Sequence, residues 1–445
     1  MPEIASPPAS TLTPAKTARQ RSDTLTSIWM IIAVAMALVT LVVKNRMPQP
    51  LWTMIHLVTL GVLSNGIFQW SWFFARSLAR LSADDPRARR HNTIRILIFN
   101  ACFLLLFVSM WLGWMVGTMI AATGIAAVAA WHGAEMLSVL RERLASRFVI
   151  VVRYYVCSAS FFVLAALLAS FVSATMFSPS IPEALVAIRD RLTLAHALSG
   201  VAGWVGLTIG GTVITLGPTI LRTRMSPDAV SGGVRVLLPW CLSLLLAIAG
   251  ALLGVMSLVG AGILAVGTCA IVGIVCPYAK VLRNKGPREY SAWSFLLGLL
   301  WISVGVCALG VASLFVSTPS QLRALTLMWL PIIGIAGFAQ LFQGALSYLM
   351  PVVIGGGPSV VRIGIAIIDW QYSLRLGLRN SALILELFLF FTSESSSVQV
   401  LRTAGWLLVI ATFVIDVVIY AKTGITQAQA RRARSETLSE SRQVQ

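Results

Sequence analysis

Residues 192–225 read LTLAHALSGVAGWVGLTIGGTVITLGPTILRTRM, and this stretch decides the fold. About 30 residues pass without a charge before Arg222 and Arg224 end the run. Because a bilayer crossing needs roughly 20 predominantly apolar residues, the stretch predicts a membrane-spanning helix. Its many glycines would let neighbouring helices approach closely in lipid. It also carries one imidazole, His196, and a ring nitrogen in hydrocarbon needs a partner, a proton or a metal.

A second stretch with similar features lies nearer the C-terminus. Residues 329–358 read WLPIIGIAGFAQLFQGALSYLMPVVIGGGP. When Gly211 is aligned on Gly344, Pro218 falls on Pro351. This partial match indicates an internal repeat, which is a strong guide to architecture.

A third and weaker copy begins at residue 51, near the N-terminus. Residues 51–74 read LWTMIHLVTLGVLSNGIFQWSWFF, with His56 near the start of the stretch. In the alignment of the other two copies, His196 falls on Trp329. We therefore expect three related helices that carry His56, His196 and Trp329 at similar depths in the bilayer.

The composition is that of a membrane protein. Of the 445 residues, 57% are hydrophobic and only 11% are charged, and the mean hydropathy is +0.84. Soluble domains have about a quarter of their residues charged, so we expect an all-α, polytopic membrane protein in contact with the lipid bilayer. The net charge of +18 does not indicate nucleic-acid binding, because the basic residues lie in short loops between apolar runs.

The apolar runs predict about twelve transmembrane helices. Because the related copies recur at every fourth helix, the twelve are expected to form three pseudo-repeated sets of four. We expect a disordered cytoplasmic N-tail at 1–24, a transmembrane helical domain at 25–421 and a basic cytoplasmic C-tail at 422–445. The expected spans are 25–44, 51–74, 95–116, 118–140, 149–174, 193–221, 236–257, 258–279, 292–316, 325–354, 376–393 and 400–421.

The distribution of Lys and Arg predicts the orientation. If the N-terminus is cytoplasmic, 28 of the 34 basic residues fall in inner segments and 6 in outer ones. Cytoplasmic loops carry the excess of Lys and Arg in membrane proteins. The sequence therefore predicts a plasma-membrane protein with both termini in the cytoplasm.

Four stretches carry a resemblance to known membrane proteins: HLVTLGVLSN, RFVIVVRYYV, GWVGLTIGGTVITLGPTILRTRM and QGALSYLMPVVIGGGP. In their order, the chain resembles an actinobacterial twelve-span membrane domain that occurs alone or fused to copper nitrite reductase-type multicopper oxidases. It is more distantly similar to heme-copper oxidase subunit I and to NnrS-type proteins. The resemblance implies heme or copper as cofactor, redox, copper or nitric-oxide/nitrite handling, and a multicopper oxidase or respiratory redox partner.

The chain departs from that pattern in its ligands. It has four histidines, one of which, His91, lies in a basic loop, and the tenth expected span has none. A reduced ligand set is therefore expected, and whether the protein is an enzyme stays open. A degenerate scaffold that docks a partner oxidase is one alternative.

His56 and His196 are the best candidate ligands. Both belong to related spans, and neutral imidazole suits heme iron and copper. The hypothesis is that the two rings bind one heme or one copper ion. The alternative is that each ring hydrogen-bonds a neighbouring helix and only orders the packing.

His132 and Glu135 form a second, weaker candidate metal site in the fourth span. Their i, i+3 spacing puts both side chains on one helix face. They could hold a metal or admit a proton. Alternatively, Glu135 could reach the membrane interface and pair with Arg141 or Arg143.

Two further carboxylates, Glu386 and Asp416, lie in the last two expected spans. A carboxylate in hydrocarbon costs several kcal/mol, so each should be protonated, paired or directed into a cavity. A transporter or channel that uses them for ion coupling is the second functional alternative. Amides in the spans are expected to form interhelical hydrogen bonds: Asn65, Gln69, Asn100, Gln340 and Gln343.

Overall fold

The computed structural model describes residues 13–82, 84–143, 149–177, 182–224, 227–284, 286–393 and 395–443. Throughout these ranges the regular structure is helical, with no β-strand. The chain divides into two compact units. Unit 1 comprises Met1–Thr215, Gly233–Gly262 and Ser317–Ser320, and unit 2 comprises Leu216–Gly232, Ile263–Val316 and Gln321–Gln445.

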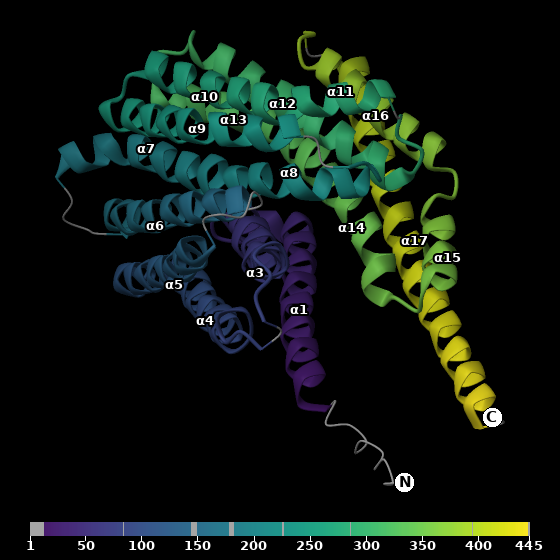
Figure 1. Ribbon diagram of the computed structural model, residues 1–445. Helices are drawn as coiled ribbons and strands as arrows, with labels where there is room; N and C mark the ends of the chain where they lie inside the picture. The colour runs from purple at the N-terminus through teal and green to yellow at the C-terminus, as the bar shows by residue number, and fades with distance from the viewer. Residues whose placement is uncertain are drawn as a thin grey trace. The chain divides into compact units, whose positions relative to one another are not determined.

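The helices of the first half follow one another with short connections (Figure 1). Their bounds are α1 (Thr13–Val43), η1 (Lys44–Arg46), α2 (Pro50–His56), η2 (Leu57–Ser64), α3 (Asn65–Leu78), η3 (Arg87–His91), α4 (Asn92–Leu112), α5 (Met115–Glu142), α6 (Val149–Phe177), α7 (Glu183–Ala197), η4 (Leu198–Gly206) and α8 (Leu207–Ile220).

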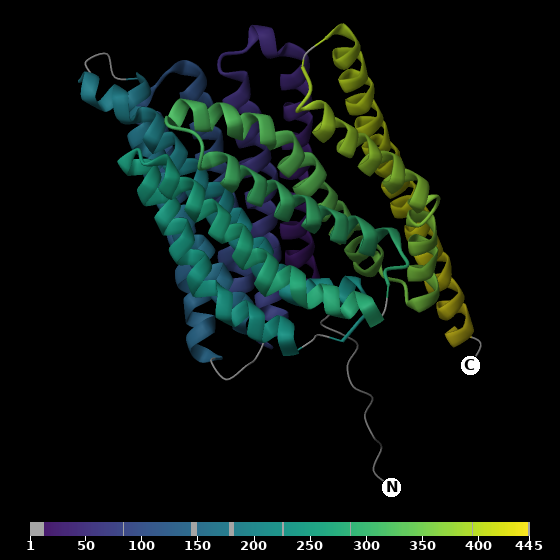
Figure 2. The same cartoon turned by 90° about the horizontal axis from the view of Figure 1, so that it is seen from above.

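The second half continues in the same way. Its elements are α9 (Pro227–Leu253), α10 (Met256–Ala270), η5 (Ile271–Val275), α11 (Cys276–Asn284), α12 (Tyr290–Ser313), α13 (Pro319–Pro331), η6 (Ile332–Ala339), α14 (Gln340–Ile354), α15 (Pro358–Ile368), α16 (Tyr372–Leu389) and α17 (Ser396–Gln443). Within unit 2, α15 and α16 both pack along α17 (Figure 2).

Ten helices of the described chain are long and apolar enough to cross a membrane. This confirms the expectation of a polytopic helical membrane protein. The two expected spans outside the ten correspond to α1, whose apolar part Thr26–Thr40 is short, and to α16. The helix α16 carries Arg375, Arg379 and Glu386, which are all almost fully buried.

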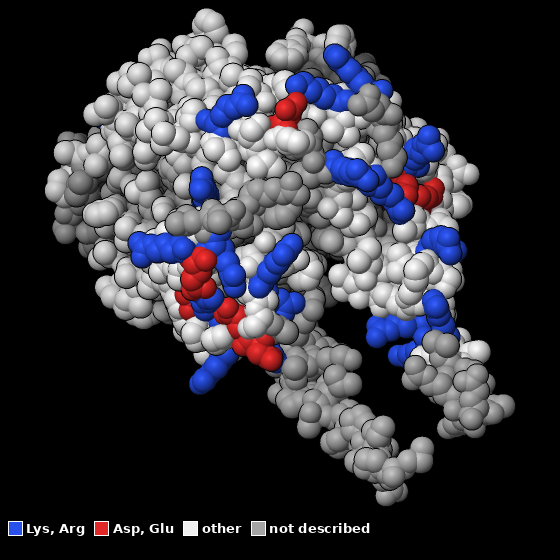
Figure 3. Space-filling view, viewed as in Figure 1, with Lys and Arg blue, Asp and Glu red and all other residues white. Residues whose placement is uncertain are grey.

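The surface agrees with a lipid environment. Large apolar side chains such as Leu112, Phe171 and Phe315 are exposed on the helices. Figure 3 shows wide areas without charge on the face that it displays, with most of its visible Asp and Glu gathered over α4 and α5. Without water around them, spanning segments must pair their backbone groups internally, and helices do so.

The ends of the chain are more helical than the tails expected from the sequence. Helix α1 begins at Thr13, and residues 1–12 of the expected N-tail lie outside the described residues. Helix α17 continues without a break to Gln443, through the segment expected as a basic C-tail.

Candidate functional site

The structure brings His56 and His196 together in unit 1. Their ring centroids are 6.1 Å apart, and the two ring planes differ by only 11°. Nδ1 of His56 lies 2.8 Å from the carbonyl oxygen of Trp52, and Nδ1 of His196 lies 2.8 Å from that of Ala165. Because a carbonyl oxygen only accepts, each Nδ1 must carry a proton and donate. In the neutral rings, Nε2 is then the nitrogen with the free lone pair.

Local backbone geometry positions both rings. His56 ends α2 directly before the π-helix η2, and His196 lies two residues before the π-helix η4. Short π-helical segments are rare and occur frequently at functional sites. Eight residues beyond each histidine, Trp204 Nε1 donates a 2.9 Å hydrogen bond to Ser64 Oγ. That bond ties the two helices together below the histidines.

The surroundings of the pair are aromatic and half-buried. The Trp52 ring stacks on His56 with centroids 4.3 Å apart and planes 22° apart. Both histidines are partly exposed. Among the described residues, no group of three or more His, Cys, Asp and Glu side chains is placed to hold a metal ion. The pair could therefore supply two protein ligands to a shared group.

The helix expected as the third copy of the repeat offers no ligand at the place expected to match the histidines. Trp329 is 6% exposed and belongs to an apolar cluster of unit 2 that includes Trp301, Ile332 and Val409. Its ring packs against Phe390 with centroids 5.7 Å apart. Tryptophan at this position fills the core.

His132 and Glu135 share a helix but have different partners. Nε2 of His132 lies 3.3 Å from Ser71 Oγ, and the ring is fully buried among Phe68, Trp72 and Trp204. Glu135 instead accepts from Arg95 and pairs with His91 at 2.7 Å. The structure thus gives Glu135 other partners than the expected Arg141 or Arg143.

Arg95 is the residue of this region that the sequence reasoning missed. It is fully buried, and its guanidinium lies 5.0 Å from the ring centroid of Trp72 and 5.3 Å from that of Trp131. Such cation–π contacts stabilise a desolvated cation. Three buried polar atoms near Trp72 have no hydrogen-bond partner in the described structure: Trp72 Nε1, Arg95 Nε and His132 Nδ1. Buried groups of this kind ordinarily bind an internal water.

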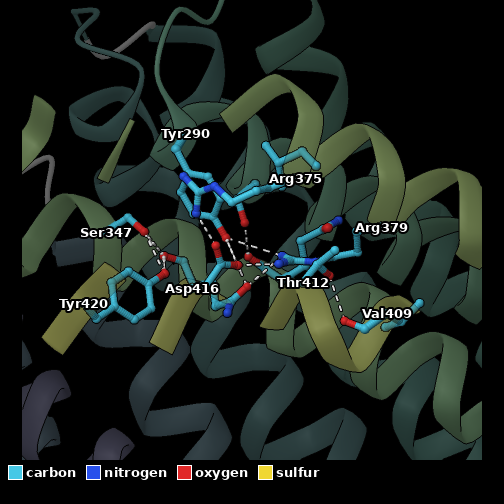
Figure 4. Close-up of polar contacts among 12 residues, drawn as sticks. Tyr290, Ser347, Arg375, Arg379, Val409, Thr412, Asp416 and Tyr420 are labelled. Atoms are coloured by element: carbon cyan, nitrogen blue, oxygen red, sulfur yellow. Dashed lines mark hydrogen bonds and ion pairs between the residues drawn. The ribbon is translucent and has the colours of Figure 1, made fainter. Parts of the chain in front are cut away.

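Unit 2 contains a larger buried charge network (Figure 4). Asp416 of α17 is completely buried and forms ion pairs with Arg375 and Arg379 of α16. Tyr290 of α12 donates a 2.6 Å hydrogen bond to Asp416 Oδ2. This confirms that Asp416 is paired. These contacts occupy the carboxylate that the transporter alternative needs for ion coupling.

Both arginines of the network also donate hydrogen bonds to neutral groups with dipoles. Arg375 donates to the carbonyl oxygens of Ile368 and Trp370, at the C-terminal end of α15. A helix C-terminus carries partial negative charge. Arg379 donates to Thr412 Oγ1 at 3.0 Å and to Gln343 Oε1 at 2.8 Å. The network joins α12, α14, α15, α16 and α17, so its first role is to hold unit 2 together.

Each unit also contains one reciprocal amide pair. In unit 1, Asn65 donates to Asn100 at 3.0 Å and Asn100 donates back at 2.7 Å. In unit 2, Gln340 donates to Asn380 at 3.2 Å and Asn380 donates back at 3.1 Å. These pairs confirm that the amides of the spans hydrogen-bond between helices.

Glu386 has weaker polar contacts than Asp416. Its nearest ion-pair partner is Arg402 at 4.0 Å, and its buried Oε1 has no hydrogen-bond partner in the described structure. Glu386 lies eleven residues beyond Arg375 on the same helix.

Spacing along the sequence does not separate the buried arginines from exposed ones. Arg95, Arg235 and Arg375 are spaced by 140 residues, and each precedes an apolar run, but Arg235 is exposed. The charge count places all three in inner loops. Arg95 and Arg375 are instead interior residues, 0% and 4% exposed.

Comparison with family models, with curated proteins and with solved structures finds no match to this chain. The geometry of its own residues must therefore carry the functional interpretation.

Proposed function

We propose that this integral membrane protein binds a heme or a copper ion between His56 and His196, for redox, copper or nitric-oxide/nitrite handling. The observation that carries the proposal is the relation between the two rings, whose near-parallel planes have centroids 6.1 Å apart. Two imidazoles on one ion, with metal–nitrogen distances of about 2.0–2.1 Å, place their centroids roughly 5–6.4 Å apart over the tetrahedral-to-linear range of ligand angles. The observed separation fits that arrangement.

The hydrogen bonds of both rings fix the tautomer that ligation requires. Metal-bound histidines commonly donate their second ring N–H to a carbonyl or a carboxylate, which fixes the tautomer. His56 and His196 both donate Nδ1–H to a backbone carbonyl. Each therefore has Nε2 prepared as a ligand.

Two observations bear on whether the group is heme or copper. Two histidines could hold a heme iron, and the described residues offer no third ligand of the His, Cys, Asp and Glu types. This favours heme. The bond between Ser64 and Trp204 holds the helices close, and a single copper ion needs less room than a porphyrin.

We also propose the twelve-helix architecture in three sets of four. One support is a glycine in each of the π-helices η2, η4 and η6, which faces the first helix of its set. A Cβ on Gly61 would lie 2.6 Å from that of Ala33, and a Cβ on Gly203 would lie 2.5 Å from that of Phe161. In the third set, a Cβ on Gly337 would lie 2.6 Å from Cγ1 of Ile302.

The polar contacts of the first and third sets give a second support. Arg95 and Asn100 are five residues apart, as are Arg375 and Asn380. In each set the arginine pairs with a carboxylate of the last helix, and the asparagine pairs with an amide of the second helix. Two sets with the same contacts are expected of an internal repeat.

The test is to purify the protein in detergent, measure heme, iron and copper per chain, and record the optical spectrum. We expect close to one heme or one copper per chain. His56→Ala and His196→Ala should each reduce that content at least tenfold, because the shared group loses one of its two ligands.

His91→Ala is the matched control, because His91 pairs with Glu135 away from the proposed site. It should leave the heme or copper content unchanged. Wild-type protein without either group, or loss of the group in the His91 variant alone, would overturn the proposal.

A further inference from the structure

Unit 2 has a cavity of about 330 Å³ that is lined by four charged residues, three with hydroxyl groups and five apolar ones. It lies where several helices end or begin: after α8, at the start of α12, at the end of α14 and along α15. Since α8, α12 and α14 are parts of candidate membrane spans, their ends belong to the membrane–water interface. A cavity there is open to molecules that are themselves amphipathic.

Not every charged side chain of the cavity has an ion-pair partner among the described residues. Arg222 forms an ion pair with Glu289 at 2.9 Å. For Arg362, the described residues offer no ion-pair partner. Asp369 accepts a 2.8 Å hydrogen bond from the backbone N–H of Tyr290, but it too has no cationic partner within ion-pair distance in the described structure. One cation and one carboxylate of the lining are therefore left to interact with a ligand.

The remaining walls suit a hydrocarbon chain. Val352, Val361 and Ile365 line the cavity beside the charged groups, and Val352 is 50% exposed. Arg362, Ile365 and Asp369 follow one another at three- and four-residue spacings, so they share one face of α15. That face places an apolar side chain between the cation and the carboxylate.

The charge network lies next to this cavity, because lining residues are hydrogen-bonded to it. Ser347 and Asp369 line it, and Ser347 Oγ lies 2.8 Å from the hydroxyl oxygen of Tyr420 (Figure 4). Ile368, another lining residue, gives its carbonyl oxygen to Arg375. A ligand in the cavity would thus contact residues that are hydrogen-bonded to the network.

We infer that this cavity binds a phosphoethanolamine zwitterion, as the headgroup of a membrane phospholipid. The phosphate would accept from the Arg362 guanidinium, which binds such groups well, and the ammonium would donate to Asp369. The apolar walls would hold the first part of an acyl chain. Burial raises the pKa of Asp369 above its ordinary value, and an ammonium beside it would compensate for that loss of solvation.

The experiment uses the full-length protein, delipidated in detergent, and measures retained lipid by native mass spectrometry. Phosphatidylethanolamine, phosphatidylglycerol and phosphatidylcholine with identical acyl chains are added separately, with soluble O-phosphoethanolamine as a fourth ligand. We expect phosphatidylethanolamine to bind most tightly. The other two lipids lose a matched contact, and the soluble compound lacks the acyl chain.

Arg362→Gln and Asp369→Asn should each weaken phosphatidylethanolamine binding about tenfold, because each removes a charge-assisted hydrogen bond. Asparagine can still accept from the Tyr290 N–H, so the Asp369 variant should fold with an unchanged melting temperature. Arg432→Gln, at an exposed arginine of α17, is the control and should bind as the wild type does.

Tighter binding of phosphatidylglycerol, or unchanged binding by Asp369→Asn, would overturn the assignment of a zwitterion. Equal binding of the soluble compound would overturn the assignment of a lipid. Equal binding by the Arg362 and Arg432 variants would show that the cavity is not the site.

Discussion

The α3–α4–α5 region of unit 1 and the α14–α16–α17 region of unit 2 contain the same kinds of polar contact, but only the first lies beside a candidate ligand. Both contain a reciprocal amide pair and an arginine paired with a carboxylate of the last helix. The helix that precedes the first region carries the candidate ligand His56, whereas the helix that precedes the second carries Trp329. The polar contacts therefore do not depend on the candidate ligands, and they belong to the scaffold.

The two regions also differ in how they compensate buried charge. Arg95 has one carboxylate partner and two indole rings. Arg375 and Arg379 share Asp416, and carbonyl oxygens of α15 and neutral side chains supply the remainder. Removing the carboxylate should therefore lower the free energy of unfolding more in unit 2 than in unit 1.

The largest effect is expected for Asp416→Asn. The substitution leaves two buried guanidinium groups without a countercharge, and breaking a buried pair in this way costs about 3–5 kcal/mol. Unfolding of the purified protein in a denaturing detergent measures the loss. The matched change Glu135→Gln should cost less, about 1–3 kcal/mol, because Glu135 is partly exposed and the indoles remain beside Arg95. Equal or reversed losses would contradict the stated difference between the regions.

A smaller effect is expected where helices approach at glycine. Gly203→Ala and Gly337→Ala should each destabilise by about 1–2 kcal/mol, because the added methyl meets Phe161 or Ile302. Gly334→Ala in the same π-helix is the control. It has open space within 4 Å, so it should be neutral or slightly stabilising. Thermal unfolding of the three variants in one detergent compares them directly. A stable Gly337 variant would remove this support for the repeat.

The amide pairs should contribute equally in the two regions. Asn100→Leu and Asn380→Leu each leave one buried amide without its partner, which we expect to cost about 1 kcal/mol. A double-mutant cycle with Asn65→Leu or Gln340→Leu gives the coupling energy within each pair. Coupling in only one of the two pairs would show that the regions are not equivalent.

The smallest effect concerns pH. The hydrogen bond from Arg87 lowers the pKa of Asp85 below its ordinary value of 3.8. A depressed folded-state pKa contributes stability above the unfolded pKa, and that contribution is lost as the pH falls through the folded value. Wild type should thus lose slightly more stability between pH 5 and pH 3 than Asp85→Asn, by less than about 1 kcal/mol. An identical loss in both proteins would show that the pair contributes nothing.

Composition and apolar run length were enough to predict a helical membrane protein, because they report directly on burial in lipid. The pairing of Asp416 could be expected for the same reason, since an isolated carboxylate in hydrocarbon is costly. The partners of Glu135 could not be predicted, because Arg95 lies 40 residues away on another helix. Nor could sequence show that both candidate imidazoles donate from Nδ1, since that depends on which carbonyl lies beside each ring.

The most direct test of the central claim is X-ray absorption of the purified protein at the iron and copper edges. The account predicts about one atom of iron or copper per chain, with two imidazole nitrogens at about 2.0–2.1 Å, and loss of that scattering in the His56→Ala, His196→Ala double variant. Neither metal above background, or imidazole scattering that is unchanged in the double variant, would contradict it.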